Sequence, residues 1–194
     1  MRELLDDPFY DLLRRYPDCL VDYVLLRPDR RYRGVPSHRE ALAFAMNLLA
    51  EREGMEWASD FDRAEAREVG LEDLLAAPST WRKDRNGTVF YDLKHNPDGG
   101  GIPYWYAFLE PPHGTGTFVD DRGEEVRRSY TPDDFRAVNR ALFPSGTKRL
   151  VALEWTTDWS EYFDDGHEWW GAACWTVYDP GLDRFAVIMA SATD

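Results

Sequence analysis

The stretch from Asp158 to Glu168 holds the densest set of chemically capable residues in this 194-residue chain. Its carboxylates and its one histidine are Asp158, Glu161, Asp164, Asp165, His167 and Glu168. Such groups could coordinate a metal ion or share acid–base work. Their spacing matches neither an EF-hand loop nor a zinc signature, because no second histidine lies near. We therefore expect no metal and no cofactor at this stretch.

Aromatic residues between these charges favour a second use, the capture of a protein. Trp and Tyr dominate the energetics of protein interfaces, and carboxylates attract a basic partner. The predicted partner-binding residues are Asp158, Trp159, Glu161, Tyr162, Asp164, Asp165, His167 and Trp169. The plain structural alternative is a solvated loop whose aromatic rings, those of Trp159, Tyr162 and Phe163, fold back on a sheet.

Paired carboxylates give an alternative hypothesis, a small hydrolase or lyase working on an aromatic-lined sheet face. The candidate acids and bases are Glu154, Asp158, Glu161 and Glu168, of which Glu154 matters most because it interrupts an apolar strand. If Glu154 points into a cleft, desolvation should raise its pKa. A buried Glu154 beside a second carboxylate would favour an enzyme, and an exposed Glu154 on an acidic face would favour a binding protein.

Other catalytic signatures are weak in this sequence. It contains no GxSxG and no GK[ST] motif, which argues against triad chemistry and against nucleotide phosphate binding. Cys174 lies among apolar neighbours in a predicted strand, the setting of an inert thiol. We expect Cys19 and Cys174 to be free thiols.

Three predicted strands position the acidic stretch: residues 149–157, 168–178 and 184–191. All three are rich in β-branched and aromatic residues and are separated by Asp, Gly and Pro clusters, which is typical of an antiparallel meander. The acidic stretch connects the first two strands. The rest of residues 79–194 predicts further strands, with an Asn86-Gly87 hairpin, a strand at 102–109, an edge hairpin at 117–130 and one helix near 132–142.

The first 78 residues read as mostly helical. Asp7 and Pro8 favour a helix start, and Ser37 with Glu40 matches a capping box that opens a helix over 38–52. In that helix Leu42, Phe44, Ala45, Leu48 and Leu49 form the predicted core face. Residues 59–70 and 71–77 predict further helices. Residues 19–26 suit a helix or a strand, with a lean to helix.

Together these elements predict a single α+β domain over residues 1–194. Its helical region, residues 1–78, packs on one face of a mostly antiparallel sheet of about five to seven strands in residues 79–194. The length suits one domain, and 43% hydrophobic residues suffice for a core without disulfides.

The charge balance restricts the class of partner. With 36 acidic against 23 basic residues the net charge is −13, which disfavours nucleic acid and anionic membrane and favours a basic protein. No apolar run reaches about 18 residues, and the first residues lack the apolar core of a signal peptide, so we expect a cytoplasmic protein. In composition, a small acidic tryptophan-rich domain is similar to the immunity proteins that neutralise bacterial toxins. That resemblance implies a non-enzymatic protein-binding module.

Overall fold

The computed structural model describes residues 1–78, 81–83, 85, 89–91, 101–109, 115–168 and 171–192. Its described strands form one six-stranded antiparallel sheet and two hairpins of two strands each, which with the helices confirms the α+β class. The order in the large sheet is β1 (Arg2–Glu3), β2 (Val21–Arg27), β10 (Arg184–Ala192), β9 (Gly171–Asp179), β8 (Val151–Trp155) and β3 (Ala66–Glu68).

The central strands are buried on both faces. Along β10 the side chains of Ala186 and Ile188 join one hydrophobic cluster, while those of Val187 and Met189 join the other. This alternation follows from the two-residue period of a strand. The sheet therefore separates two cores and needs a covering layer on each side.

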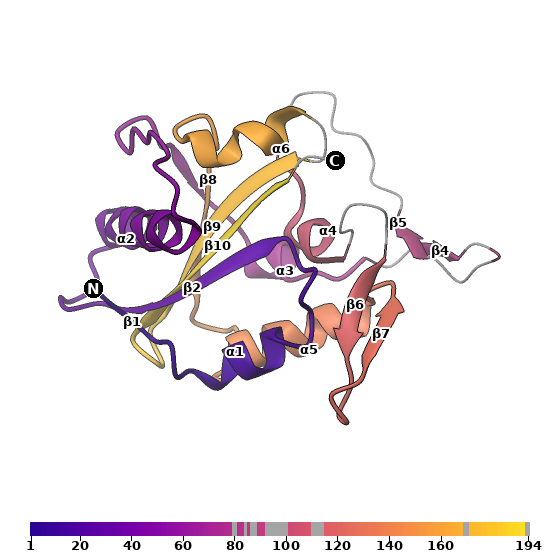
Figure 1. The fold of residues 1–194 in the computed structure, drawn as a ribbon. Coiled ribbons are helices and arrows are strands. Elements are labelled where there is room, and N and C mark those ends of the chain that lie inside the picture. The colour runs from indigo at the N-terminus through magenta and orange to yellow at the C-terminus, as the bar shows by residue number, and fades with distance from the viewer. Residues whose placement is uncertain are drawn as a thin grey trace.

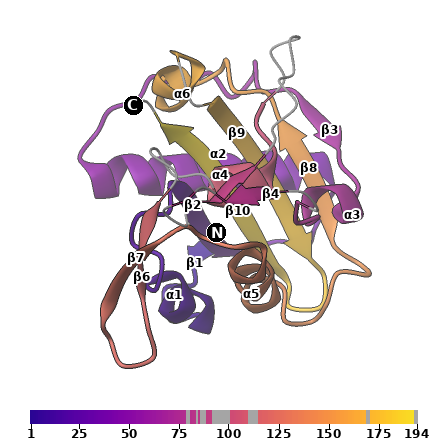
Figure 2. The same cartoon turned by 90° about the vertical axis from the view of Figure 1, so that its right-hand side faces the viewer.

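Helices supply both layers. Helix α2 (Val35–Glu53) covers one face, and α1 (Pro8–Leu13), α4 (Tyr104–Leu109) and α5 (Pro132–Leu142) cover the other (Figure 1). Figure 2 shows α4 and α5 in front of the sheet with α2 behind it. The sequence pattern placed the helices on a single face; because the central strands are apolar on both sides, the helices divide between the two.

The C-terminal meander and two helix starts are confirmed. Strands β8, β9 and β10 pair in succession, as predicted. Asp7 caps α1 by accepting a hydrogen bond from the backbone of Phe9 at 3.0 Å. Thr131 and Asp134 form a capping box at α5, in which each side chain accepts from the other residue's backbone amide.

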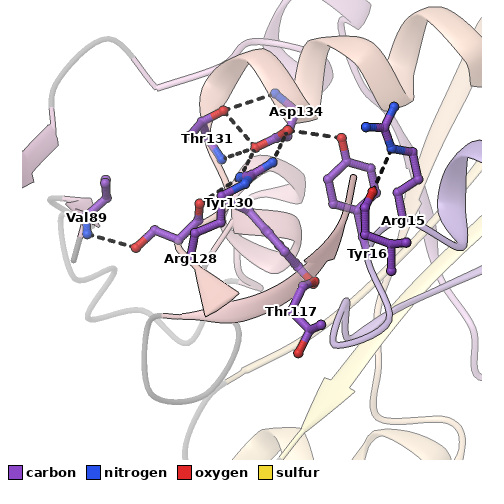
Figure 3. Close-up of polar contacts among 10 residues, drawn as sticks. Arg15, Tyr16, Val89, Thr117, Arg128, Tyr130, Thr131 and Asp134 are labelled. Carbon is purple, nitrogen blue, oxygen red and sulfur yellow. Dashed lines mark hydrogen bonds and ion pairs between the residues drawn. The ribbon is translucent and has the colours of Figure 1, made fainter. Parts of the chain in front are cut away.

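The α5 capping box is also the anchor of the edge hairpin formed by β6 (Gly116–Val119) and β7 (Glu125–Arg128). Figure 3 shows the Asp134 carboxylate between Arg128, Thr131 and Tyr16. Arg128 donates to both carboxylate oxygens, at 2.6 and 2.9 Å, and the Tyr16 hydroxyl donates at 3.0 Å. Burial alone would raise the pKa of Asp134, but the hydrogen bonds from Arg128 and Thr131 lower it.

Tyr130 fixes the start of the same hairpin. Its hydroxyl donates to the Thr117 carbonyl at 2.8 Å (Figure 3), and its ring lies against Gly116. A Cβ atom at Gly116 would lie 2.7 Å from the Tyr130 ring, so only glycine fits there without a shift. The predicted hairpin over 117–130 is thus confirmed and held by side chains from α5 and from its preceding turn.

The second hairpin pairs β4 (Trp81–Lys83) with β5 (Val89–Tyr91). This confirms the pairing that the sequence predicted on either side of Asn86-Gly87. The turn itself lies outside the described residues.

Four local predictions are wrong. Residues 19–26 lean to helix in sequence, but they form most of β2, because pairing with β10 buries both of their faces. Residues 59–70 form turns and the short strand β3, which pairs with β8. Residues 102–109 form helix α4 instead of a strand, with Tyr106 and Ala107 both donating backbone hydrogen bonds to Pro103.

The predicted capping box at Ser37 is the fourth correction. Helix α2 begins earlier, after Gly34, and Ser37 is its third residue. The Ser37 hydroxyl accepts a hydrogen bond from the Arg33 backbone at 3.0 Å, and Glu40 forms an ion pair with the Arg33 side chain at 2.6 Å. Both side chains therefore hold the preceding loop instead of the helix end.

Both cysteines are free thiols, with Cys174 buried and Cys19 half-buried. Burial raises the pKa of Cys19 to about 12, so its thiol stays protonated at neutral pH. Among the helices of the described ranges, none combines the length and apolar character that crossing a bilayer requires.

Candidate functional site: an acidic surface on two joined loops

The acidic stretch predicted from sequence folds as two short helices after β8. Ser160 begins the 3₁₀ helix η1 (Glu161–Phe163) by accepting a hydrogen bond from the Tyr162 backbone at 3.3 Å, and α6 (Asp164–Glu168) follows directly. Gly166 lies so close to the backbone of Gly171 that a Cβ atom would not fit. This contact holds α6 against the start of β9.

Trp159 turns inward from this stretch. Its side chain is 2% exposed, its indole donates to the Thr156 carbonyl at 2.5 Å, and its ring lies edge-on to Phe163 at 5.3 Å between centroids. A ring buried in this way cannot contact a partner at the surface. The prediction that Trp159 anchors a partner is therefore wrong, and the structural alternative, a ring folded back on the sheet, holds for this residue.

The acidic stretch is joined to a second loop that follows α2. Ser59 and Ser160 form an isolated β-bridge, and their hydroxyls are 2.8 Å apart. On either side, Asp60 donates its backbone N–H to the Trp159 carbonyl at 2.7 Å, and Ala58 donates to the Glu161 carboxylate at 2.9 Å. These bonds hold two acidic segments side by side.

We call the two loops with their flanking residues, 51–68 from the last turn of α2 to the end of β3 and 156–168 from the end of β8 to α6, the two-loop acidic surface. Twelve carboxylates lie on it against three arginines, so it carries nine of the thirteen net negative charges of the chain. All twelve are exposed: Glu51, Glu53, Glu56, Asp60, Asp62, Glu65, Glu68, Asp158, Glu161, Asp164, Asp165 and Glu168.

The three arginines of this surface already have acidic partners. Arg63 pairs with Asp158 at 3.0 Å, Arg67 pairs with Glu154, and Arg52 pairs with Glu3. Among the described residues, Asp158 is the only one of the twelve carboxylates that forms an ion pair, which leaves a field of one sign over both loops.

Apolar side chains interrupt this field. Met55 is 51% exposed, and Trp57, Phe61 and Tyr162 are half-buried. The Trp57 ring lies edge-on to Tyr162 at 5.1 Å, and Phe61 lies over Trp159 at 5.2 Å. Sequence reasoning missed Met55, Trp57 and Phe61, although their position inside an acidic run resembles that of the stretch it did select.

Of the other residues predicted to form the site, those on α6 are exposed, and one lies outside the described residues. Asp164, Asp165 and Glu168 are exposed on α6, and the exposed His167 lies 2.8 Å from the Thr157 hydroxyl. Trp169 lies outside the described residues.

The hydrolase hypothesis required Glu154 beside a second carboxylate. The Glu154 side chain is 19% exposed and forms an ion pair with Arg67, its cross-strand neighbour on β3. Asp158 likewise pairs with Arg63. Each carboxylate thus faces an arginine, which is the arrangement of structural ion pairs and not of an acid–base couple.

The described carboxylates also do not converge as metal ligands. Across the described ranges, no three His, Cys, Asp or Glu side chains are grouped so that they could hold a metal ion. The two-loop acidic surface is a charged face interrupted by the apolar side chains of Met55, Trp57, Phe61 and Tyr162.

We compared the chain with models of known protein families, with curated proteins and with solved structures. None of the three comparisons finds a match.

Proposed function

We propose that this protein is a non-enzymatic binding module that captures a basic protein through the two-loop acidic surface. The observation that carries the proposal is the concentration of nine net negative charges on two hydrogen-bonded loops, with apolar side chains among them. In kind this would be the task of an immunity protein, performed in the bacterial cytoplasm.

Electrostatic attraction is the first support for this proposal. A field of one sign over a continuous surface raises the rate at which a partner of opposite sign is encountered, and salt screens the effect over about 8 to 10 Å. Most of the surface carboxylates are exposed and, among the described residues, form no ion pair with an arginine, so their charge is directed to solvent.

The apolar side chains are the second support. Trp57 and Tyr162 lie edge-on to each other among the carboxylates, Met55 precedes Trp57 by two residues, and all three are only partly covered by their own protein. Aromatic residues at the centre of an interface contribute most to slowing dissociation. Trp57 therefore takes the anchoring role that the sequence suggested for Trp159.

Association kinetics test the proposal once a partner has been recovered by affinity capture from the native host. Neutralising Glu56, Asp165 and Glu168 together (E56Q, D165N, E168Q) should lower the association rate constant about tenfold and flatten its salt dependence. Trp57→Ala should chiefly raise the dissociation rate, by about 2 kcal/mol of binding free energy.

A matched control removes the same amount of charge elsewhere. Glu124, Glu125 and Asp133 are exposed on the β6–β7 hairpin and α5, away from both loops. If E124Q, E125Q and D133N together slow association as much as the first triple variant does, net charge and not this surface is responsible. Turnover of a small substrate that Glu154→Gln abolishes would overturn the proposal in favour of an enzyme.

A further inference from the structure

The end of the large sheet opposite α6 carries a positive charge. Strands β2 and β9 run parallel because both are antiparallel to β10, so β2 ends beside the β9–β10 turn, whereas α6 precedes β9 at the other end (Figure 1). Three segments meet beyond this end of the sheet, residues 27–34, 143–150 and 179–184. They hold seven basic and three acidic side chains, a net charge of +4 in a chain of −13. We call these three segments the basic end.

Contacts between side chains join the three segments. The Tyr32 ring of the first segment stacks on Tyr178, which directly precedes the third, with 4.0 Å between ring centroids. The Ser145 hydroxyl of the second segment donates a hydrogen bond to the Asp179 carboxylate of the third at 2.6 Å. The basic end is therefore one continuous surface.

Most cations of the basic end are available for an outside partner. Arg33 pairs with Glu40, and the buried Arg184 pairs with Asp7. Asp29, one of the three acidic side chains, is bound to the N-terminal amine at 2.6 Å. Among the described residues, five cations of the basic end are exposed and form no ion pair: Arg27, Arg30, Arg31, Lys148 and Arg149. They leave a positive field at this end of the molecule.

Stability of α2 does not account for this separation of charge. The helix begins directly after the first segment of the basic end and finishes in the two-loop acidic surface. Arg33 lies just before it, no acidic residue lies in its first turn, and Glu51 and Glu53 outnumber Arg52 at its last turn. A helix is stabilised by anions at its N-terminus and by cations at its C-terminus, so these charges oppose its macrodipole. A contact between molecules gives them a role.

The two charged surfaces also expose apolar side chains. Leu182 in the basic end is 36% exposed, and Val35, directly after its first segment, is 45% exposed. Met55 on the two-loop acidic surface is 51% exposed. Protein interfaces combine an apolar centre with a polar rim. The two surfaces are thus opposite in charge, and each offers apolar area to a contact.

The net charge of −13 does not prevent contact between copies of the chain. At about 0.15 M ionic strength, salt screens charges that lie more than about 8 Å apart. A domain of this length has a radius of gyration of about 16 Å, so the centres of two touching copies are more than about 30 Å apart. Repulsion between the net charges is therefore screened, and the charges that face each other at the contact decide the outcome.

We infer that copies of this protein associate head to tail, with the basic end of one copy against the two-loop acidic surface of the next. The contact is heterologous because it joins two different surfaces, so each added copy leaves one surface of each kind open. A copy bound in this way covers the surface proposed to capture a basic protein, and self-association would thereby regulate capture. Only this regulatory consequence rests on the proposed function.

Sedimentation velocity of the natural protein at increasing concentration tests the association without any partner. At about 0.15 M salt the mean mass should rise past that of a dimer, and at about 1 M, where the screening length is about 3 Å, the protein should be monomeric. A monomer at every concentration would overturn the inference. So would a species that stops at the dimer, or association that persists at the higher salt concentration.

Two triple variants locate the contact. R30Q, R31Q and R149Q together remove charge from the basic end, and E56Q, D165N and E168Q together remove it from the two-loop acidic surface. Each variant alone should lower the association constant by at least about tenfold. An equimolar mixture of the two should form dimers and nothing larger, because only one intact pair of complementary surfaces remains. A mixture that stays monomeric would contradict the head-to-tail contact.

Matched controls change the net charge by the same amounts elsewhere. The triple variants R122Q, R127Q, R136Q and E124Q, E125Q, D133N alter exposed positions on the β6–β7 hairpin and α5. Both should associate as the natural protein does. Loss of association in either control would assign the effect to net charge and overturn the inference.

The regulatory consequence is measured separately, with the captured basic partner. The apparent affinity of the natural protein for that partner should fall at concentrations where it self-associates, whereas that of the R30Q, R31Q, R149Q variant should stay constant. Equal behaviour of the two proteins would overturn the regulatory role. Self-association of a protein that captures no partner would contradict the proposed function alone and support the head-to-tail contact.

Discussion

His38 has no exposed surface and lies in a small polar network between α2 and the sheet. Its Nδ1 is 2.8 Å from the Thr176 hydroxyl and its Nε2 is 3.1 Å from that of Tyr32, while Trp155 donates its indole N–H to Thr176. Neutral imidazole satisfies these contacts. Burial lowers the pKa of His38 from 6.5 to about 4.

The free energy of unfolding should therefore decrease on acidification. Below pH 6.5 the His38 imidazole is protonated in the unfolded chain, whereas in the folded protein it stays neutral down to about pH 4. The contribution of His38 to the free energy of unfolding is therefore fully present above pH 6.5 and decreases as the pH falls. Between those limits the loss should reach about 3 kcal/mol. Denaturant unfolding from pH 7.5 to 4.5 measures it. His38→Gln should flatten this part of the profile, whereas His167→Gln, at an exposed histidine, should not; identical profiles for both variants would contradict the explanation.

Asp134 combines a helix cap with an ion pair, so its replacement should be costly. Asp134→Asn leaves Arg128, whose side chain is 29% exposed, without its carboxylate and weakens the hydrogen bonds with Thr131 and Tyr16. We expect a loss of about 3 kcal/mol in the free energy of unfolding. Asp133→Asn, one residue earlier and 90% exposed, should cost less than about 0.5 kcal/mol. Equal costs in denaturant unfolding would mean that the network of Figure 3 contributes little.

At the scale of elements, α2 shows that an apolar helix pattern predicts some buried residues correctly and others not. The predicted core face contained Leu42, Ala45 and Leu49, which are buried, but also Phe44 and Leu48, which are half-buried. The apolar stripe is wider than the face that the sheet covers, so the pattern alone could not separate its centre from its margin.

Alanine substitutions in α2 should reproduce this difference. Leu42→Ala removes a side chain with no exposure and should cost about 2 to 5 kcal/mol. Leu48→Ala, at the half-buried margin, should cost about 1 kcal/mol. Denaturant unfolding measures both; a larger loss for Leu48→Ala would show that the helix is rotated from the described position.

Local signals explain which elements could be predicted. The caps of α1 and α5 and the β-branched and aromatic composition of β8, β9 and β10 are encoded within each segment, and these elements are confirmed. Residues 19–26 carry both helix and strand signals, and only the distant partner β10 decides between them. Residues 59–70 match the pattern of a capped helix. In the folded protein, however, Ser59 forms a β-bridge with Ser160 and Arg67 pairs with Glu154 of β8.

The candidate site was likewise predictable only in the part that local sequence encodes. The acidic stretch was found because composition marks it, but the direction of Trp159 depends on Phe61 and Phe163, which no local pattern reveals. Phe61 lies in residues 59–70, for which the pattern predicts a helix, and Trp57 lies just before them, so neither residue was predicted to belong to the surface. Residue type located the surface, and tertiary contacts decided which of its aromatic rings face outward.

At the scale of the whole molecule, charge is unevenly distributed. The two-loop acidic surface carries nine net negative charges, and all remaining residues carry four. Such an asymmetry gives the protein an electric dipole that would orient it toward a cationic partner before contact. In the proposed capture of a basic protein, the association rate should therefore depend on ionic strength more steeply than the net charge alone implies.

The position of β10 also dictates when the fold can form during synthesis. Strand β10 lies between β2 and β9, and Val21 pairs with Ala190 at its far end. As a chain leaves the ribosome from its N-terminus, β2 emerges with its central neighbour still untranslated. The apolar residues of β2 therefore stay exposed, where they can bind chaperones or aggregate, until β10 has been synthesised. Pairing of an early strand with a late one raises the contact order, so folding should be slow.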